Sequence, residues 1–429
     1  MSSRRRGSPG TASTFGTMAE ISLLIHDLEA AVSPQGGGPL RGRDLGELEI
    51  QAPASIAISG GRITSVGPPR EVLRRVPSGT DYVTFDGRGR VALPGLVDCH
   101  THAAFLGSRA AEFEQRSRGA SYEELHAAGG GILSTVSATR AGSEEDLRAA
   151  IEKHLGWMLE HGTTSAEVKS GYGLDLETEL KSLRAVRDAA ENHPVDAYPA
   201  FLGAHAVPPE FSGAADYVGF VISEVLPEAA RLADAADVFL ERGSFEVPEG
   251  RRYLQACASY GLALRLHADQ FSERGAIPLG VELGARSVDH LENTGEEGAR
   301  LLARSDVAAV LLPACGLFLD LPLPPARFLV EEGAIVALAT DFNPGSSFCE
   351  SLPLVMNLGC TRLKLSPAEA LNACTANAAH VLGLDDVGRL APGYRADVLV
   401  LDAPDWRYLA YHLGGDRFAA RIKSGRMLA

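Results

Sequence analysis

The chain has 429 residues, 45% of them hydrophobic, and a formal net charge of −15. This length suits a large barrel with an attached second domain, and the negative charge disfavours binding to nucleic acid or to an anionic membrane. The six cysteines are scattered without CxxC spacing, which indicates reduced thiols and a cytoplasmic protein. No apolar run is long enough to span a membrane. We therefore expect a small-molecule partner, with no nucleic acid and no membrane.

Residues 1–18 are predicted to form a disordered N-terminal extension. The stretch carries Arg4, Arg5 and Arg6 followed by Ser, Gly and Thr, and it lacks the apolar centre of a secretion signal. A start assigned too early, with Met18 as the true first residue, would explain the same pattern.

Short strands separated by turns are predicted at both ends of the chain, over residues 19–93 and 385–429. Residues 56–63 indicate a hairpin, because a Gly-Gly pair separates two apolar runs. Near the other end, residues 396–401 are typical of a buried strand, and residues 421–426 of a last strand and turn. We expect the two ends to build one small β domain together.

Strands alternate with helices over residues 94–384. A helix over 143–161 begins with the capping pair Ser143 and Asp146, and a helix over 367–382 begins with a Ser-Pro-Ala-Glu start signal. The candidate strands cover residues 96–101, 163–168, 196–203, 237–241, 262–267, 286–290, 308–313 and 335–341. This alternation predicts the α/β fold class, as a parallel (β/α)8 barrel.

Polar residues at the C-terminal ends of the barrel strands are the candidate site residues, because chemistry in such barrels takes place at that face. Five of the twelve histidines fall at predicted strand ends. In chain order, the strand-end residues are His100, His102, Lys169 (with Tyr172 close behind), His205, Glu241, His267, His290 and Asp341. The seventh strand ends at residues 313–316 with no obvious catalytic group.

His100 and His102 lie two apart on the first barrel strand, so their side chains point to the same face. Both imidazoles can therefore reach one ion, and neutral imidazole is a good ligand for zinc and for divalent iron. A hydrogen-bonded structural role is the alternative for any single histidine, but it does not explain five of them at strand ends.

Histidines on the first, fifth and sixth strands with an aspartate on the eighth resemble the amidohydrolase superfamily. The β segments at the chain ends are similar to its small β-sandwich domain, and residues 391–399 resemble the return of its chain to that domain. A narrower resemblance, to the imidazolonepropionase family, extends from about Ile21 to Lys423. Five segments carry it: residues 105–113, 129–132, 167–174, 202–205 and 340–346.

This resemblance implies that one divalent metal, either Zn²⁺ or iron (Fe²⁺ or Fe³⁺), is held by His100, His102, His267 and Asp341. Metal-activated water would attack the ring carbonyl of 4-imidazolone-5-propanoate and open its cyclic amide. The product would be N-formimidoyl-L-glutamate, in histidine degradation.

Attack needs a group that takes the water proton and returns it to the leaving nitrogen. Asp341 and His290 are the candidates, and His290 could instead orient the metal ligands. His205 could donate to the developing oxyanion or only position the substrate. Gln270 stands where related deaminases carry a glutamate proton shuttle. Because an amide cannot relay a proton, Gln270 argues against deamination and is expected to bind the substrate ring.

The propionate tail of the substrate needs cations and hydrogen-bond donors. Arg109 is predicted to grip the carboxylate in bidentate fashion, with a salt bridge to Glu112 as the alternative. Tyr172 and Tyr122 would add hydroxyl donors. The resemblance also places three residues of the turn after the last strand against substrate or product: Asn343, Gly345 and Ser346.

Lys169 and Glu241 raise the alternative of a two-metal site, bridged by a carboxylated lysine or an acid. A salt bridge between the two residues is the preferred interpretation. Two other functions stay open from the sequence: another amidohydrolase, such as a heterocycle deaminase or cyclic amidase, and a metal-free barrel that only binds partners. The resemblance implies a homodimer.

Overall fold

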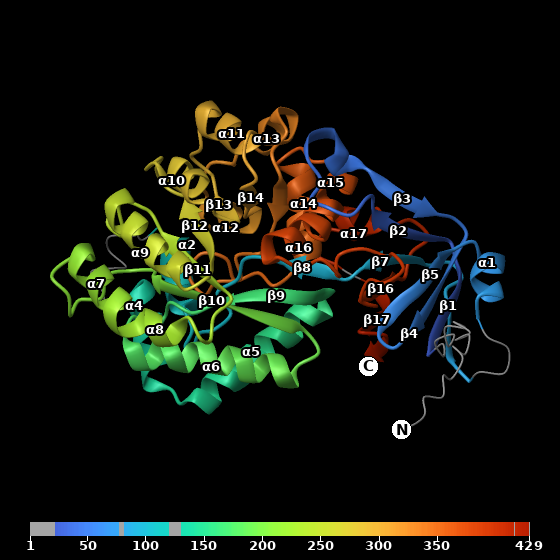
Figure 1. Cartoon of the computed structure of the whole chain (residues 1–429), viewed down its shortest axis with the longest axis horizontal. Helices are drawn as coiled ribbons and strands as arrows, with labels where there is room; N and C mark the ends of the chain where they lie inside the picture. The colour runs from blue at the N-terminus through green and yellow to red at the C-terminus, as the bar shows by residue number, and fades with distance from the viewer. Residues whose placement is uncertain (1–21, 77–80, 120–129, 416, 429) are drawn as a thin grey trace, which may run out of the picture.

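The computed structural model describes residues 22–76, 81–119, 130–415 and 417–428. It consists of a barrel of strands and helices, on the left of Figure 1, and a β domain on the right. The predicted extension over residues 1–18 and the predicted substrate-binding residue Tyr122 lie outside the described residues. Every helix in the described ranges falls short of the length and hydropathy that a membrane span requires.

Eight parallel strands lie side by side in chain order and form the barrel. A bridge between Thr101 and Phe342, just beyond the first and last strands, closes the ring, and the His102 N–H donates to the Phe342 carbonyl there at 2.9 Å. The strands are β8 (Leu96–Asp98), β9 (Thr163–Lys169), β10 (Asp196–Ala204), β11 (Ala235–Phe239), β12 (Ala263–Ala268), β13 (Ser287–His290), β14 (Ala308–Leu311) and β15 (Val336–Leu338). The predicted (β/α)8 barrel is confirmed.

The helices that follow the barrel strands bury apolar side chains against the barrel, except α2, which has no buried residue. They are α2 (Ala110–Ser117), α4 (Ile132–Ala141), α5 (Glu144–Glu160), α6 (Leu176–Asn192), α7 (Ala214–Phe220), a π-helical turn over Val221–Val225, α8 (Leu226–Ala229), α9 (Val247–Ser259), α10 (Ala276–Leu283), α11 (Glu296–Ala303), α12 (Pro313–Leu319), α13 (Ala326–Glu332), α14 (Leu352–Thr361), α15 (Pro367–Ala373) and α16 (Ala376–Leu382). The predicted capping box opens α5, where the side chains of Ser143 and Asp146 each accept the other's backbone N–H at 3.1 Å.

The predicted continuous helix over 367–382 is wrong, because the chain breaks between α15 and α16. Thr375 leaves the helical conformation (φ −130°, ψ −91°). The carbonyl of Cys374 instead accepts a hydrogen bond from the N–H of Val97 on β8, at 2.9 Å. The break therefore ties this segment to the first barrel strand. The predicted seventh strand, 308–313, is also too long, because Pro313 already begins α12.

Both ends of the chain contribute to the β domain, as predicted, and the blue and red strands lie side by side in Figure 1. One sheet has the order β5 (Arg62–Gly67), β4 (Ala54–Ser59), β1 (Leu23–Leu28), β6 (Val83–Asp86). The other has the order β18 (Arg426–Leu428), β17 (Phe418–Lys423), β16 (Val398–Leu401), β7 (Val91–Pro94), β2 (Ala30–Pro34), β3 (Leu48–Gln51). Apolar side chains of both sheets share one core, which includes Ile25, Ile56, Ile58, Val398 and Ile422. The predicted hairpin is confirmed as β4 and β5. Three short helical segments, a 3-10 turn over Gly42–Gly46, α1 (Pro69–Arg74) and α17 (Tyr408–Tyr411), complete the fold.

A buried amide joins the N-terminal segment to the barrel. The side chain of Asn377 on α16 accepts the N–H of Leu40 at 2.7 Å. Its amide nitrogen donates to the carbonyls of Leu40 and Val336, at 2.9 and 2.8 Å. One side chain therefore satisfies three backbone groups that burial removes from water.

Asn377→Leu should lower the free energy of unfolding by about 3 kcal/mol, because the apolar side chain leaves those three backbone groups unsatisfied. Urea denaturation measures the loss. The matched control is Asn192→Leu at an exposed position on α6, where a change under about 0.5 kcal/mol is expected. Equal losses in the two variants would contradict the role given to Asn377.

Candidate active site

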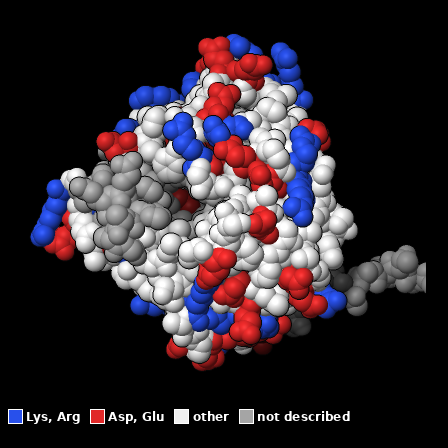
Figure 2. Space-filling view, turned by 90° about the vertical axis from the view of Figure 1, so that its left-hand side faces the viewer, with Lys and Arg blue, Asp and Glu red and all other residues white. Residues whose placement is uncertain are grey.

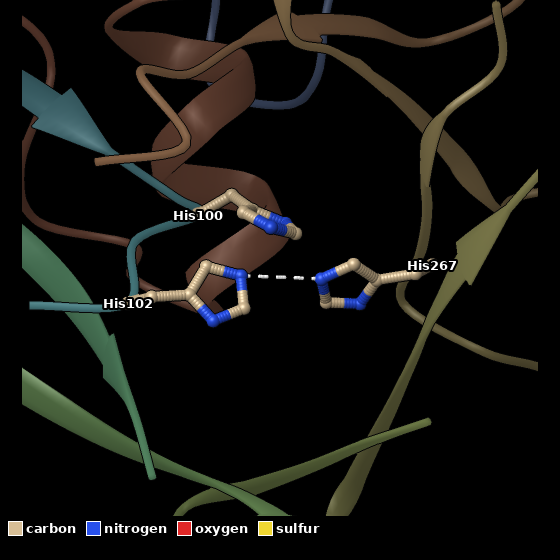
Figure 3. Close-up of side chains that lie close together, drawn as sticks. All are labelled: His100, His102 and His267. Atoms are coloured by element: carbon tan, nitrogen blue, oxygen red, sulfur yellow. Dashed lines mark hydrogen bonds between the residues drawn. The ribbon is translucent and has the colours of Figure 1, made fainter. Parts of the chain in front are cut away.

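Three imidazoles from distant segments meet at the C-terminal end of the barrel. His100 and His102 follow β8, and His267 lies near the end of β12 (Figure 3). The Nε2 atoms of His102 and His267 face each other at 3.2 Å. A ligand atom of each ring lies within 4.8 Å of one from both other rings. The expectation that these segments converge is therefore fulfilled for the histidines.

Asp341 completes the group. Its Oδ1 atom lies 3.4 Å from Nε2 of His102 and 3.6 Å from Nε2 of His100. Both this oxygen and Nε2 of His100 are buried without a hydrogen-bond partner. Buried polar atoms are normally satisfied, so orphaned atoms that face one another fit a site for a cation. Imidazole nitrogens with one carboxylate oxygen form a donor set that fits zinc or iron.

Two buried carboxylates hold the rings from behind. Asp289 Oδ2 lies 2.6 Å from Nδ1 of His100, and Asp237 Oδ1 lies 3.1 Å from Nδ1 of His267. Because each aspartate contacts Nδ1, the Nε2 atom of the same ring points toward the centre of the group. Burial lowers the pKa of His267 to about 4 and that of His100 well below its usual value, which favours the neutral form that binds metals. Sequence reasoning missed both aspartates, although each lies within a predicted strand.

His290 lies at the end of β13, beside this group. It shares a cluster of ligand atoms within 4.8 Å with His100 and Asp341. Its Nδ1 atom lies 3.4 Å from Glu292 Oε1. Burial lowers the pKa of His290, but the carboxylates of Glu292, Asp341 and Asp289 together outweigh burial, so its pKa is raised overall. Sequence reasoning did not single out Glu292.

Backbone strain is concentrated at the same place. His290, Leu291 and Asp341 have φ values of +86°, +71° and +51°, in the left-handed region that residues with a side chain rarely adopt. Such strain persists where the surrounding structure enforces it, and it is common at functional sites.

The segment after the seventh strand brings a buried thiol to the edge of the site. Cys315, on α12, is buried, and its sulfur lies within 4.8 Å of ligand atoms of His290 and Glu292. Its sulfur accepts a hydrogen bond from Nε2 of Gln270 at 3.4 Å. The chain of contacts places the amide of Gln270 at the site, where the sequence predicts it.

We call His100, His102, His267 and Asp341 the metal group. His205 lies against it, with its ring stacked on that of His102 at 5.2 Å between centroids. Its Nδ1 atom lies 2.9 Å from the carbonyl oxygen of Gly171. Gly171 has φ +107°, and a Cβ there would lie 2.8 Å from the Leu202 carbonyl, so only glycine fits. Burial, with the neighbouring His267, lowers the pKa of His205 to about 3.

Arg109 makes the salt bridge that the sequence left as the alternative. Its Nε and Nη2 atoms donate to Glu112 Oε2 at 3.0 and 2.6 Å. Its remaining nitrogen, Nη1, lies where a Cβ of Gly345 would be, at 1.9 Å from that position. Glycine at 345 therefore lets the guanidinium lie across the turn after β15.

Tyr172 and the turn after β15 lie on the same side of the site. Tyr172 is buried with its ring centroid 6.2 Å from that of His102, and burial raises the pKa of its hydroxyl. Asn343 Oδ1 accepts the N–H of Gly345 at 2.8 Å. Ser346 Oγ donates to Asp341 Oδ2 at 3.0 Å. The turn residues thus connect the aspartate of the metal group to the predicted tail site.

The predicted salt bridge between Lys169 and Glu241 is wrong. Lys169 Nζ lies 2.6 Å from Glu167 Oε2 and 2.8 Å from Asp237 Oδ2. Glu241 accepts instead the backbone N–H groups of Phe271 and Ser272, at 2.9 and 3.1 Å. The reason is position along the barrel axis: Lys169 points into the barrel interior, whereas Glu241 lies beyond the end of β11.

The end of the molecule that carries α4 and α7 faces the viewer in Figure 2. Acidic and basic side chains are interspersed on this face around a hollow near its middle. An anionic substrate would therefore depend on local groups such as Arg109 rather than on a field of one sign.

Comparisons with known proteins agree with this site. Residues 91–424 match the model of the amidohydrolase family. The imidazolonepropionase of Rubrobacter xylanophilus is 76% identical over 412 residues, which cover 96% of this chain and 99% of that protein. The imidazolonepropionase of Chloroflexus aggregans is 45% identical over 428 residues, with coverages of 96% and 99%.

Solved structures share the fold at low sequence identity. An adenosine deaminase from Xanthomonas campestris with bound zinc superposes with a TM-score of 0.69 at 17% identity, over 96% of this chain and 93% of that chain. An N-isopropylammelide isopropylaminohydrolase from Burkholderia multivorans gives 0.68 at 21% identity, with coverages of 95% and 98%. The matched family model and the close relatives together show that this chain belongs to the imidazolonepropionase family of the amidohydrolases.

Proposed function

We propose that this chain hydrolyses the cyclic amide of 4-imidazolone-5-propanoate to N-formimidoyl-L-glutamate, in histidine degradation, with one divalent metal. One observation carries the proposal: unpartnered buried atoms of His100 and Asp341 converge with His102 and His267 in a chain 76% identical to an imidazolonepropionase. These four residues would hold Zn²⁺ or iron. The bound ion would supply hydroxide at neutral pH by lowering the pKa of a water molecule.

Asp341 and His290 would share the proton transfer. Asp341 would hold the ion through Oδ1, so its other oxygen, Oδ2, which also accepts from Ser346 Oγ, would take the proton of the attacking water. His290 lies close by, and Glu292 stabilises its protonated ring, so it can deliver a proton to the leaving ring nitrogen. The amide of Gln270 can only hydrogen-bond the substrate ring, which disfavours deamination.

His205 is better suited to positioning the substrate than to stabilising an oxyanion. The Gly171 carbonyl can only accept, so Nδ1 of His205 carries the proton. Because the low pKa keeps the ring neutral, Nε2 is an acceptor for an N–H group of the substrate. This replaces the donor role that the sequence left open for His205.

The propionate tail would bind between Arg109 and the turn after β15. Glu112 occupies the Nε and Nη2 side of Arg109, so Nη1 is left to meet the carboxylate, with the hydroxyl of Tyr172 as a second donor. Tyr122 would add a third. The backbone and side chains of Asn343, Gly345 and Ser346 would contact the substrate or the amino-acid end of the product.

We also propose that the enzyme acts in the cytoplasm as a homodimer. All six cysteines are free in the structure, which suits a reducing compartment. The homodimer rests on the family resemblance alone.

The purified protein should hold about one zinc or iron ion per chain, measured by elemental analysis. A chelator should abolish formation of N-formimidoyl-L-glutamate, and either metal added back should restore it.

His267→Ala should lose metal and activity together, because one of four ligands is missing. Guanine and cytosine serve as control substrates and should not be converted. Retained metal and activity in His267→Ala would remove this residue from the ligand set.

Gly345→Ala should raise KM by about 10- to 100-fold with little change in kcat, since its Cβ would displace Arg109 from the substrate carboxylate and cost a charged hydrogen bond. Arg109→Ala should have the same effect. Steady-state kinetics measure both. The control is Gly37→Ala, where an added Cβ meets no atom within 4 Å. A change in kcat alone would show that Arg109 does not bind the tail.

His290→Gln should reduce kcat by about 10²- to 10⁴-fold while the metal content stays at the parental level. Elemental analysis and single-turnover kinetics on the same preparation separate the two quantities. Loss of metal together with activity would instead make His290 a support of the ligands.

A further inference from the structure

The barrel interior below the metal ligands holds a column of charged side chains. We define the charged column as Glu167, Lys169, Asp237, Arg265 and Asp289, each 3% exposed or less. The interiors of such barrels are normally filled by branched apolar side chains. Buried ion pairs cost several kcal/mol in desolvation and are weak contributors to stability. The charged column therefore calls for a role beyond folding.

Strand periodicity places the charged column against the ligands. Arg265 and His267 lie two apart on β12, so they point to the same face, and so do Glu167 and Lys169 on β9. Asp237 on β11 is paired in register with Arg265 on β12. Both residues therefore lie one layer of inward-pointing side chains below His267. Within the barrel, the charged column thus lies directly below the metal group, on the side of the N-terminal ends of the strands.

Lys169 lies at the centre of the contacts. Its ammonium lies between Glu167 and Asp237, at 2.6 and 2.8 Å, with no exposed surface. Arg265 pairs with Glu167 from the other side and donates to the Cys99 carbonyl at 3.4 Å. Two cations therefore face three carboxylates in the charged column.

Asp237 connects Lys169 to a ligand. Its Oδ2 atom contacts the ammonium, and its Oδ1 atom lies 3.1 Å from Nδ1 of His267. Asp289, which holds His100 at 2.6 Å, has an oxygen within 4.8 Å of Asp237. The ammonium of Lys169 thus pairs with one of the two carboxylates that orient the ligands, and that carboxylate lies close to the other.

We propose that Lys169 is a positioning residue for the metal ligands: its ammonium fixes Asp237, and Asp237 turns Nε2 of His267 toward the ion. The inference rests on the metal site of the proposed function. It also replaces the two-metal alternative, because a carboxylated lysine would bring a third negative charge against Glu167 and Asp237.

The test compares Lys169→Met with Lys423→Met in the full-length, zinc-loaded protein. Lys423 is the matched control, since its ammonium is also buried between two carboxylates, Asp196 at 2.6 Å and Asp397 at 2.7 Å, but it lies in the β domain. Competition with a chromophoric chelator gives the Kd for Zn²⁺. We expect Lys169→Met to raise this Kd by about 10- to 100-fold and Lys423→Met to leave it within about threefold. Equal shifts in the two variants would overturn the inference, because general destabilisation would then explain both.

A double variant, Glu167→Gln with Lys169→Met, covers the case in which the single variant does not fold. It removes one carboxylate with the ammonium and keeps the net charge of the charged column, while Asp237 still lacks its cation. We expect this variant to bind Zn²⁺ as weakly as Lys169→Met. Parental affinity in either variant would overturn the role of Lys169, and so would two zinc ions per parental chain. A parental protein that binds no Zn²⁺ or iron would instead overturn the proposed metal site itself.

Discussion

The mutual approach of buried donor atoms at the end of the barrel is the constraint on which the rest of the structure depends. His102 and His267 bring ring nitrogens to 3.2 Å, and Asp341 adds an oxygen that no protein group satisfies. Such an arrangement is costly without a cation. Asp237 and Asp289 make it tenable, because they bind the opposite edges of the rings and fix which nitrogen faces inward. Metal binding and barrel closure are therefore linked, since Asp341 lies beside the bridge that joins the first and last strands.

Strand-end logic was sufficient to predict the histidines and Asp341, because parallel strands of a barrel bring their carboxyl ends to one face whatever the details of packing. It could not predict the partner of Lys169, since Glu167, Asp237 and Glu241 differ in depth along the barrel axis, and a sequence does not give that depth. The position of Cys315 could not be predicted, because the chain turns into α12 soon after β14. The approach of Arg109 to Gly345 joins two loops far apart in sequence, and their conformations follow from tertiary contacts.

Local signals predicted helix starts better than helix continuity. The capping boxes at Ser143 and Ser366 are both present, because each depends on residues only three apart. The break at Thr375 depends on a hydrogen bond from Val97, nearly three hundred residues away, so propensity could not reveal it. Propensity also could not reveal the role of Glu179. Its buried carboxylate accepts the backbone N–H groups of Gly171, Gly173 and Leu174, and it thereby shapes the loop that carries Tyr172.

The pairing of β7 with β16 has a consequence for biosynthesis. β7 pairs with β16, which is synthesised about three hundred residues later. Just after β7, the Gly95 N–H donates to the Asp397 carbonyl at 2.9 Å. While the ribosome is still translating, one edge of β7 stays open and exposes unpaired backbone groups, which favour aggregation. The β domain can therefore be completed only after β16 has been synthesised, and a nonsense mutation before β16 would leave that edge of β7 permanently uncovered.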